Sequence, residues 1–181
     1  MKINLLIIGK KSFIGSNIYD YYKHKYKVKI ISFKEFLKKK EKYLKRFNYV
    51  INCTTSQRYI LKKYNSINDF DLIIAKKISH LRIHMIFIST RKVYKPKFDI
   101  KEISLLKPIC SYSRNKLTTE KKLIKILKKK ATILRVSNLI GLPLKKSRKK
   151  LHYTFIDHFF DNIKNGVIYN NGKIYKDFIS I

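Results

Sequence analysis

INLLIIGKKSFIG, at residues 3–15, indicates the fold class of the chain. Ile3 to Ile8 is a short, unbroken apolar run, which is typical of a strand buried on both faces of a parallel sheet. Gly9 ends the run, and a helical pattern of apolar residues begins at about Phe13. A strand, a glycine turn and a helix at this spacing predict the opening of a βαβ unit.

The same alternation continues along the chain. Further buried strands are expected at residues 28–32, 49–53, 83–89 and 131–136, and helices at residues 33–45, 68–81 and 111–129. Strands that alternate with helices predict an α/β fold, a Rossmann-like doubly wound parallel sheet with helices on both faces. After Gly141 the pattern changes, and we expect a basic loop, a helix over 153–164 and short strands near 167 and over 174–181.

The charge of the chain is strongly positive. Its 181 residues include 43 Lys and Arg against 11 Asp and Glu, a formal net charge of +32. A hydrophobic content of 45% is enough for a folded core and argues against disorder. Only seven of the basic residues are Arg and the lysines are widely spread, so a solvated lysine coat is favoured over a nucleic-acid surface. Such a coat attracts polyanions non-specifically at low salt.

Several classes of protein are excluded or disfavoured. The apolar run Leu5–Ile8 is too short to span a bilayer. We also expect that this run is not part of a secretory leader. Cys53 and Cys110 cannot build a disulfide framework and suit a reducing compartment. His80 and His84 are too few for a metal site. We therefore expect a cytoplasmic protein that has no metal and no membrane association.

The first turn has the spacing of a dinucleotide-binding loop. Gly9 and Gly15 fit the pattern G-x-x-G-x-x-G, and Ser12 stands where the middle glycine would be. A tight turn at Gly9 and close packing at Gly15 would leave N–H groups around Phe13 and Ile14 available to a pyrophosphate. The added Cβ of Ser12 predicts weaker or slightly displaced binding. The alternative is a strand–helix turn that needs glycine for structural reasons alone.

The end of the second expected strand bears on the choice of cofactor. A carboxylate about twenty residues after the glycine turn usually binds the adenosine ribose, and Ser32, Phe33 and Lys34 stand there instead. A hydroxyl and a lysine tolerate a 2′-phosphate better than a carboxylate does. The cofactor is therefore expected to be NAD or NADP, with Ser32 and Lys34 favouring NADP, unless Lys34 is simply one more surface lysine.

Tyr112 and Lys116 form a Y-x-x-x-K pattern near the start of an expected helix. Four-residue spacing places both side chains on one helical face. A lysine ammonium beside a phenol stabilises the phenolate, which makes the phenol a useful acid–base group near neutral pH. Thr90, at the end of the fourth expected strand, could orient a substrate oxygen. The alternative is chance, because the chain holds 13 tyrosines and many lysines.

Taken in order, six segments resemble the extended short-chain dehydrogenase/reductase family, in its NAD-dependent epimerase/dehydratase group that acts on nucleotide sugars. These segments are residues 8–16, 50–53, 87–94, 108–120, 134–141 and 176–179. The resemblance implies that Tyr112 and Lys116 are the catalytic pair and that Thr90 is the catalytic hydroxyl. It also implies hydride transfer to or from a nicotinamide, in a reductase or an epimerase/dehydratase, and a possible homodimer.

The resemblance and the turn chemistry together give two sets of candidate binding residues. The cofactor set is Gly9, Ser12, Phe13, Ile14, Gly15, Ser32, Lys34, Cys53, Thr54 and Lys116. The substrate set is Asn138 with the basic residues Lys145, Lys146 and Arg148, which could meet the sugar or its diphosphate. We expect an NAD(P)-binding Rossmann domain over residues 1–141 and a partial substrate-binding region over residues 142–181.

The length of the chain leaves a second function open. Members of this family run to roughly 300 residues, so the resemblance implies a chain that is truncated at its C-terminal end. The alternative is a non-catalytic Rossmann protein that binds cofactor, RNA or a partner subunit.

Overall fold

The computed structural model describes residues 3–140, 164–165 and 178–180. Two compact units divide the chain, Met1–Ser137 and Asn138–Ile181. In the second unit, β6 (Asn138–Ile140) pairs in parallel with β7 (Phe178–Ser180). The helix expected over 153–164 lies, except for its last residue, outside the described residues, and so does the strand expected near 167.

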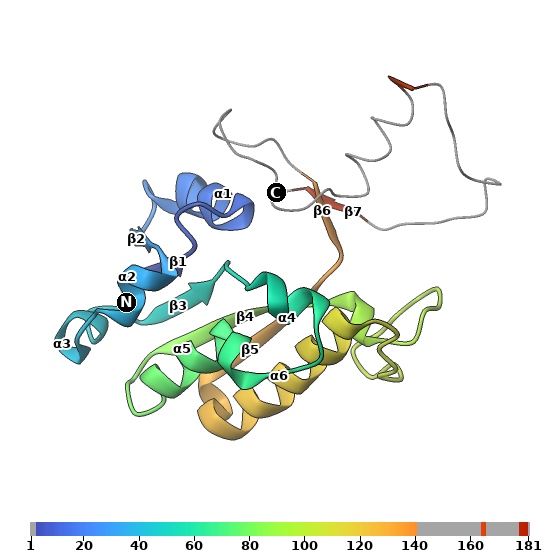
Figure 1. Ribbon diagram of the computed structural model, residues 1–181. Coiled ribbons are helices and arrows are strands. Elements are labelled where there is room, and N and C mark those ends of the chain that lie inside the picture. The colour runs from blue at the N-terminus through green and yellow to red at the C-terminus, as the bar shows by residue number, and fades with distance from the viewer. Residues whose placement is uncertain (1–2, 141–163, 166–177, 181) are drawn as a thin grey trace. The chain divides into compact units, whose positions relative to one another are not determined.

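The first unit is built on a parallel sheet of five strands in the order β2-β1-β3-β4-β5 (Figure 1). The strands are β1 (Asn4–Ile8), β2 (Lys27–Ile31), β3 (Tyr49–Asn52), β4 (His84–Thr90) and β5 (Ala131–Val136). The chain leaves β1 to form β2 on one side and returns to form β3 on the other. Such a reversal opens a crevice at the carboxyl ends of the strands, where α/β proteins bind ligands. The predicted Rossmann-like α/β class is confirmed.

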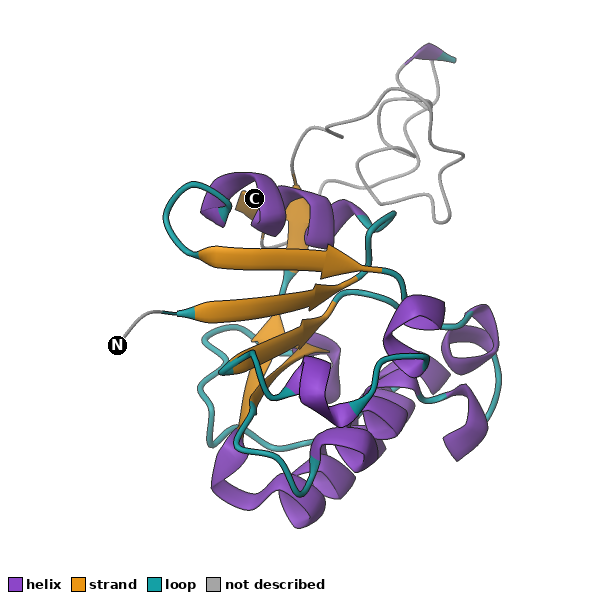
Figure 2. Ribbon diagram, turned by 90° about the vertical axis from the view of Figure 1, so that its left-hand side faces the viewer, coloured by secondary structure: helices purple, strands orange, loops and turns teal. Residues whose placement is uncertain are grey.

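Helices cover both faces of this sheet (Figures 1 and 2). They are α1 (Phe13–Tyr22), α2 (Phe33–Leu37), α3 (Glu41–Leu44), α4 (Gln57–Leu61), α5 (Phe70–Ile78) and α6 (Ser111–Leu127). On one face Leu6, Met85 and Phe87 pack with Ile74 of α5 and Leu123 of α6. On the other face, Ile18 and Tyr19 of α1 pack on Leu5, Ile7 and Ile51. No helix among the described residues is long and apolar enough to cross a bilayer.

Two helical segments differ from the sequence prediction. The helix expected over residues 33–45 is split into α2 and α3, because Lys38–Lys40 contribute no buried side chain and Lys40 is extended. Leu37, at the end of α2, is 43% exposed. Helix α4 is missing from the prediction, since five residues are too few to show a helical period. Its Tyr59 is buried, and its hydroxyl lies 2.6 Å from Thr119 Oγ1 of α6.

The turn between β1 and α1 has no room for side chains at its two glycines. Gly9 has a φ of +141°, which L side chains rarely adopt, and a Cβ there would lie 3.0 Å from the Cβ of Cys53. A Cβ on Gly15 would lie 2.6 Å from Ser12 Oγ and 2.8 Å from the carbonyl oxygen of Gly9. The helix, the first strand and the loop after β3 therefore approach one another at these two positions.

Gly15→Ala should destabilise the chain by about 1–3 kcal/mol, because the new Cβ overpacks a contact with the backbone of Gly9. Urea denaturation followed by circular dichroism measures this loss. Asn17→Ala, on the same helix, is the control and should change the free energy of unfolding by less than about 0.5 kcal/mol. Equal stability of the two variants would contradict the close approach.

Candidate active site

The carboxyl ends of β1, β3 and β4 bring the predicted residues to one edge of the sheet (Figure 1). Ile8 lies opposite Asn52 in the parallel register, so the Gly9 turn and the Cys53 loop leave the sheet side by side. The Cys53 N–H donates to the Ile8 carbonyl at 2.7 Å. We call this edge the rim.

The glycine turn presents unpaired donors at the rim. Ser12 is the N-cap of α1, and its hydroxyl oxygen accepts a hydrogen bond from the Gly15 N–H at 2.8 Å. Among the described residues, no acceptor faces the N–H groups of Phe13 and Ile14. These are the first two N–H groups of the helix, where an anion is stabilised by the unpaired donors and the helix dipole. Ser12 thus occupies one donor and leaves two available.

Asn52, which the sequence prediction missed, organises the loop after β3. It is 3% exposed, and its Oδ1 accepts hydrogen bonds from the Thr54 N–H at 3.0 Å and the Thr54 hydroxyl at 2.7 Å. Its Nδ2 donates to Asp71 Oδ1 of α5 at 2.8 Å. Burial, aided by the charge of Asp71, raises the pKa of the Cys53 thiol. The raised pKa disfavours the thiolate, and the Cβ of Cys53 packs against the glycine turn.

The end of β2 carries a carboxylate after all. Ser32 caps α2, accepting from the Glu35 N–H at 3.1 Å, and its own N–H donates to Glu35 Oε2 at 2.6 Å. The hydrogen bonds from Ser32 hold the pKa of Glu35 below its usual value. Lys34 is exposed. The S-x-x-E capping signature was the signal in the sequence that could have placed an acid here.

Lys116 of α6 is buried, 5% exposed, with its ammonium directed at the sheet. Its Nζ donates to the Ile88 carbonyl of β4 at 2.8 Å and lies 3.5 Å from Asp71 Oδ2. The rings of Phe87, Tyr59 and Tyr112 surround it, with centroids 4.4, 5.7 and 6.0 Å from Nζ. The half-buried Tyr112 is one helical turn earlier, so the predicted pair does share one face of α6.

Thr90 ends β4, two residues after the carbonyl that binds Lys116. It is 8% exposed, and its hydroxyl oxygen accepts from the Lys92 N–H at 3.3 Å, capping the short turn Arg91–Val93. Helix α6 packs against both β4 and this turn. The same strand therefore positions Thr90 and anchors Lys116.

Polar contacts fix the buried face of α6. Asn115 Nδ2 donates to the Tyr59 carbonyl at 2.7 Å, and the Thr119 hydroxyl donates to Asp69 Oδ2 at 2.7 Å. Glu120, 1% exposed, accepts from the guanidinium of Arg135 at 2.7 Å. With these partners on three neighbouring elements, α6 cannot rotate without losing several buried hydrogen bonds.

The remaining predicted residues belong to the second unit. Asn138 is the first residue of β6. Lys145, Lys146 and Arg148 lie outside the described residues. Within residues 3–140, 164–165 and 178–180, no group of three or more His, Cys, Asp or Glu side chains could hold a metal ion.

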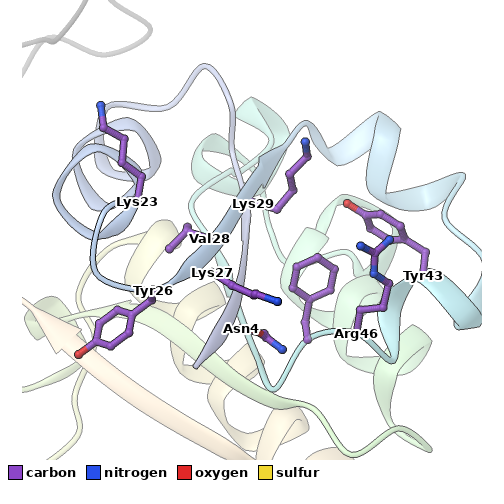
Figure 3. Close-up of a pocket in the computed structure, with 9 residues that line it drawn as sticks. Asn4, Lys23, Tyr26, Lys27, Val28, Lys29, Tyr43 and Arg46 are labelled. Atoms are coloured by element: carbon purple, nitrogen blue, oxygen red, sulfur yellow. The ribbon is translucent and has the colours of Figure 1, made fainter. Parts of the chain in front are cut away.

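A second feature lies at the opposite edge of the sheet, where β1 and β2 begin. A cavity of about 760 Å³ there is lined by Asn4 and Val28, by the cations Lys23, Lys27, Lys29 and Arg46, and by the rings of Tyr26, Tyr43 and Phe47 (Figure 3). Lys23 forms an ion pair with Asp20 and, in Figure 3, extends away from the other three cations. We call these nine residues the basic pocket. It holds none of the predicted site residues.

Lys116→Met should cost about 3 kcal/mol of stability at pH 8, because it leaves the buried Asp71 carboxylate without its counter-charge. Burial already raises the pKa of Asp71 to about 6, against the opposing effect of Lys116, and removing Lys116 raises it further. The folded variant then binds more protons than the unfolded one, so its unfolding free energy falls as pH rises.

The loss measured by urea denaturation should therefore be smaller at pH 5 than at pH 8. Lys121→Met, an exposed lysine of the same helix, is the control and should change little at either pH. A loss for Lys116→Met that does not depend on pH would contradict the pairing.

Comparisons with known proteins bear on this geometry. A UDP-N-acetylglucosamine 4-epimerase from Methanobrevibacter ruminantium M1, solved with UDP-N-acetylmuramic acid, is 24% identical with a TM-score of 0.75, over 99% of this chain and 70% of that one. A UDP-glucose 4-epimerase from Thermotoga maritima, solved with UDP-glucose, is 18% identical with a TM-score of 0.71. The match covers 98% of this chain and 69% of that one. At these identities the likeness is one of fold.

A third solved structure has NAD bound. It is a UDP-glucuronic acid 4-epimerase from Bacillus cereus, in complex with UDP-glucuronic acid and NAD, at 16% identity and a TM-score of 0.71, over 98% of this chain and 69% of that one.

A comparison with the curated proteins finds no match. A family model described as "NAD dependent epimerase/dehydratase family" matches residues 5–181. With nearly the whole chain matched, the protein belongs to the NAD dependent epimerase/dehydratase family.

Proposed function

We propose that this protein uses NAD to transform a nucleotide sugar, with Tyr112 as the acid–base residue. The observation that carries the proposal is the rim. At the rim, the first N–H groups of α1 are unpaired, and the Nζ of the buried Lys116 lies 6.0 Å from the Tyr112 ring centroid. Both features stand on the fold of this family. Residues 1–141 would bind the cofactor, and residues 142–181 would contribute to the substrate site.

The residues of the glycine turn fit a dinucleotide. Because Gly9 and Gly15 have no side chains, α1, β1 and the loop after β3 lie close together at the rim. The Phe13 and Ile14 N–H groups would hold the pyrophosphate there. Thr54 and Lys116 would line the path toward the nicotinamide end. When bound, NAD supplies a hydride acceptor that returns the hydride later in an epimerase or a dehydratase.

Tyr112 would move the proton. Its hydroxyl would take the proton from a sugar hydroxyl, or give it to a keto oxygen, as the hydride leaves or arrives. Thr90 would donate a hydrogen bond to the same oxygen. Lys116 would bind the nicotinamide ribose with an N–H that its two protein partners do not use.

For the substrate, the proposal keeps the residues that the sequence resemblance implies. Asn138 would contact the sugar, and Lys145, Lys146 and Arg148 would meet its diphosphate, since bidentate or clustered cations suit phosphate oxygens. UDP-sugars are the first probes to test, because solved structures of the same fold contain them. Epimerisation, dehydration and reduction share the transfer of a proton and a hydride at a sugar carbon; dehydration adds the loss of water, and reduction consumes a reduced cofactor instead of regenerating it.

The basic pocket supports a second candidate function, because it holds cations and aromatic rings and no carboxylate among its lining side chains. Cations and stacking rings suit single-stranded RNA. Strand β2 is the outermost strand of the sheet, and its lysines prevent it from pairing with a strand of another molecule. This role accounts for the lysines without any ligand. We therefore rank RNA binding second.

Tyr112→Phe should abolish turnover of any accepted UDP-sugar and leave the dissociation constant for NAD within about twofold, because only the transferable proton is lost. Product analysis by chromatography and NAD titration by calorimetry measure the two effects. Tyr64→Phe, which removes a phenol that donates to Asp69 instead, is the matched control and should keep turnover. Undiminished turnover in Tyr112→Phe would refute the assignment.

Glu35 favours NAD over NADP, against the expectation from Ser32 and Lys34, because its carboxylate lies at the end of β2 and would repel a 2′-phosphate. Glu35→Gln should therefore improve NADP binding about threefold relative to NAD. Glu41→Gln, at an exposed glutamate of α3, should leave the ratio unchanged. A wild-type preference for NADP would count against this role of Glu35.

A further inference from the structure

Asp71, on the first turn of α5, is the nearest negative charge to the Lys116 ammonium. It is 4% exposed, and its two oxygens have different partners. Oδ1 accepts from Asn52 Nδ2 at 2.8 Å, and Oδ2 lies 3.5 Å from Lys116 Nζ. Three elements of the fold, β3, α5 and α6, thus meet through one carboxylate.

A buried ion pair is seldom there for stability alone. Taking both charges out of water costs about as much as their attraction returns, and a well-packed apolar pair is often as stable. The environment of Lys116 is otherwise apolar, with the rings of Phe87 and Tyr59 nearby. A buried ammonium needs an anion close by to compensate for its lost hydration. Asp71 supplies that anion.

The geometry also limits where the ammonium can lie. A lysine has three N–H donors, and two of them have acceptors here, the Ile88 carbonyl and Asp71 Oδ2. Asn52 holds the carboxylate and, through Thr54, also shapes the rim loop after β3. A change at Asp71 would therefore alter the direction of the third donor without touching the Tyr112 side chain.

We propose that Asp71 is a positioning residue: its carboxylate, held by Asn52, keeps the Lys116 ammonium fixed against the Ile88 carbonyl, so that the third N–H is available to a cofactor hydroxyl. This inference rests on the proposed function, because it assigns the cofactor as the partner of that N–H. Asp71 itself touches neither cofactor nor substrate in this scheme.

Several titratable groups surround Asp71. Lys116 favours its charged form, whereas burial and the neighbouring Asp69 oppose it, and its pKa is raised to about 6. Tyr59 and the Cys53 thiol also feel its charge, and both have raised pKa values. On acidification below pH 6, Asp71 is therefore the carboxyl beside Lys116 that takes up a proton and releases the ammonium.

The first test needs no cofactor. In protein labelled with ¹⁵N-lysine, the Lys116 Nζ resonance is assigned by its absence in Lys116→Met. We expect it to shift with a midpoint near pH 6 in the wild type and at a somewhat lower pH in Asp69→Asn, which removes a neighbouring negative charge, and to show no such midpoint in Asp71→Asn. A wild-type resonance with no midpoint between pH 5 and 7, or one that persists in Asp71→Asn, would overturn the inference. The wild-type titration decides the matter even if Asp71→Asn does not fold.

The second test uses NAD itself, titrated by calorimetry at pH 7.5 and pH 5. Asp71→Asn should weaken binding about tenfold at pH 7.5 and remove the weakening that acid causes in the wild type. Asp69→Asn, a buried aspartate that bonds to Thr119 and Tyr64 instead, should stay within about twofold of the wild type.

The outcomes separate the two proposals. Wild-type affinity in Asp71→Asn, with weakened binding in Lys116→Met, would sink the positioning role and leave the proposed function standing. If wild-type protein does not bind NAD, the proposed function fails and the cofactor role of Asp71 fails with it. In that case the resonance of Lys116 still shows whether the two charges are coupled.

Discussion

The burial of the Lys116 ammonium between α6 and the sheet is the constraint on which the candidate site depends. A charge that is only 5% exposed must be satisfied, and it is satisfied by the Ile88 carbonyl and by Asp71. These two bonds set the distance of α6 from β4 and from α5. They also set how Tyr112, one turn away on α6, and Thr90, at the end of β4, are presented at the rim.

A large part of the fold could be predicted from the sequence. Parallel strands buried on both faces read as continuous apolar runs, so the run Ile3–Ile8 and its counterparts were visible without a structure. The break at Lys38–Lys40 and the short helix α4 were not visible, because tertiary packing and not helical period decides segments of five residues. The burial of Tyr59 against α6 is what stabilises α4.

Some residues of the candidate site could also be predicted from the sequence, and others could not. Gly9, Ser12, Tyr112 and Lys116 stand at spacings that sequence alone can show, and their roles remain proposals. Asn52 and Asp71 are distant in sequence from Lys116, and only the parallel register of β3 and β4 and the packing of α5 on α6 reveal that they meet. Glu35 was hidden for another reason, because it lies three residues past the expected position and reaches back through a capping box.

The charge of the chain has two roles that the fold separates. At the rim, the groups to which the proposed function assigns the chemistry are buried or capped. At the other edge, the exposed strand β2 and the basic pocket carry cations with no carboxylate among them. A polyanion that is bound by charge alone would bind at the basic pocket. A dinucleotide that is bound by specific hydrogen bonds would bind at the rim.

Backbone amide NMR of the ¹⁵N-labelled protein during a titration with NAD at physiological salt tests this distinction directly. The account predicts that the amides of Phe13, Ile14, Gly15 and Thr54 shift first, while those of Lys27, Lys29 and Arg46 stay in place. Shifts confined to the basic pocket, or none at the glycine turn, would contradict it.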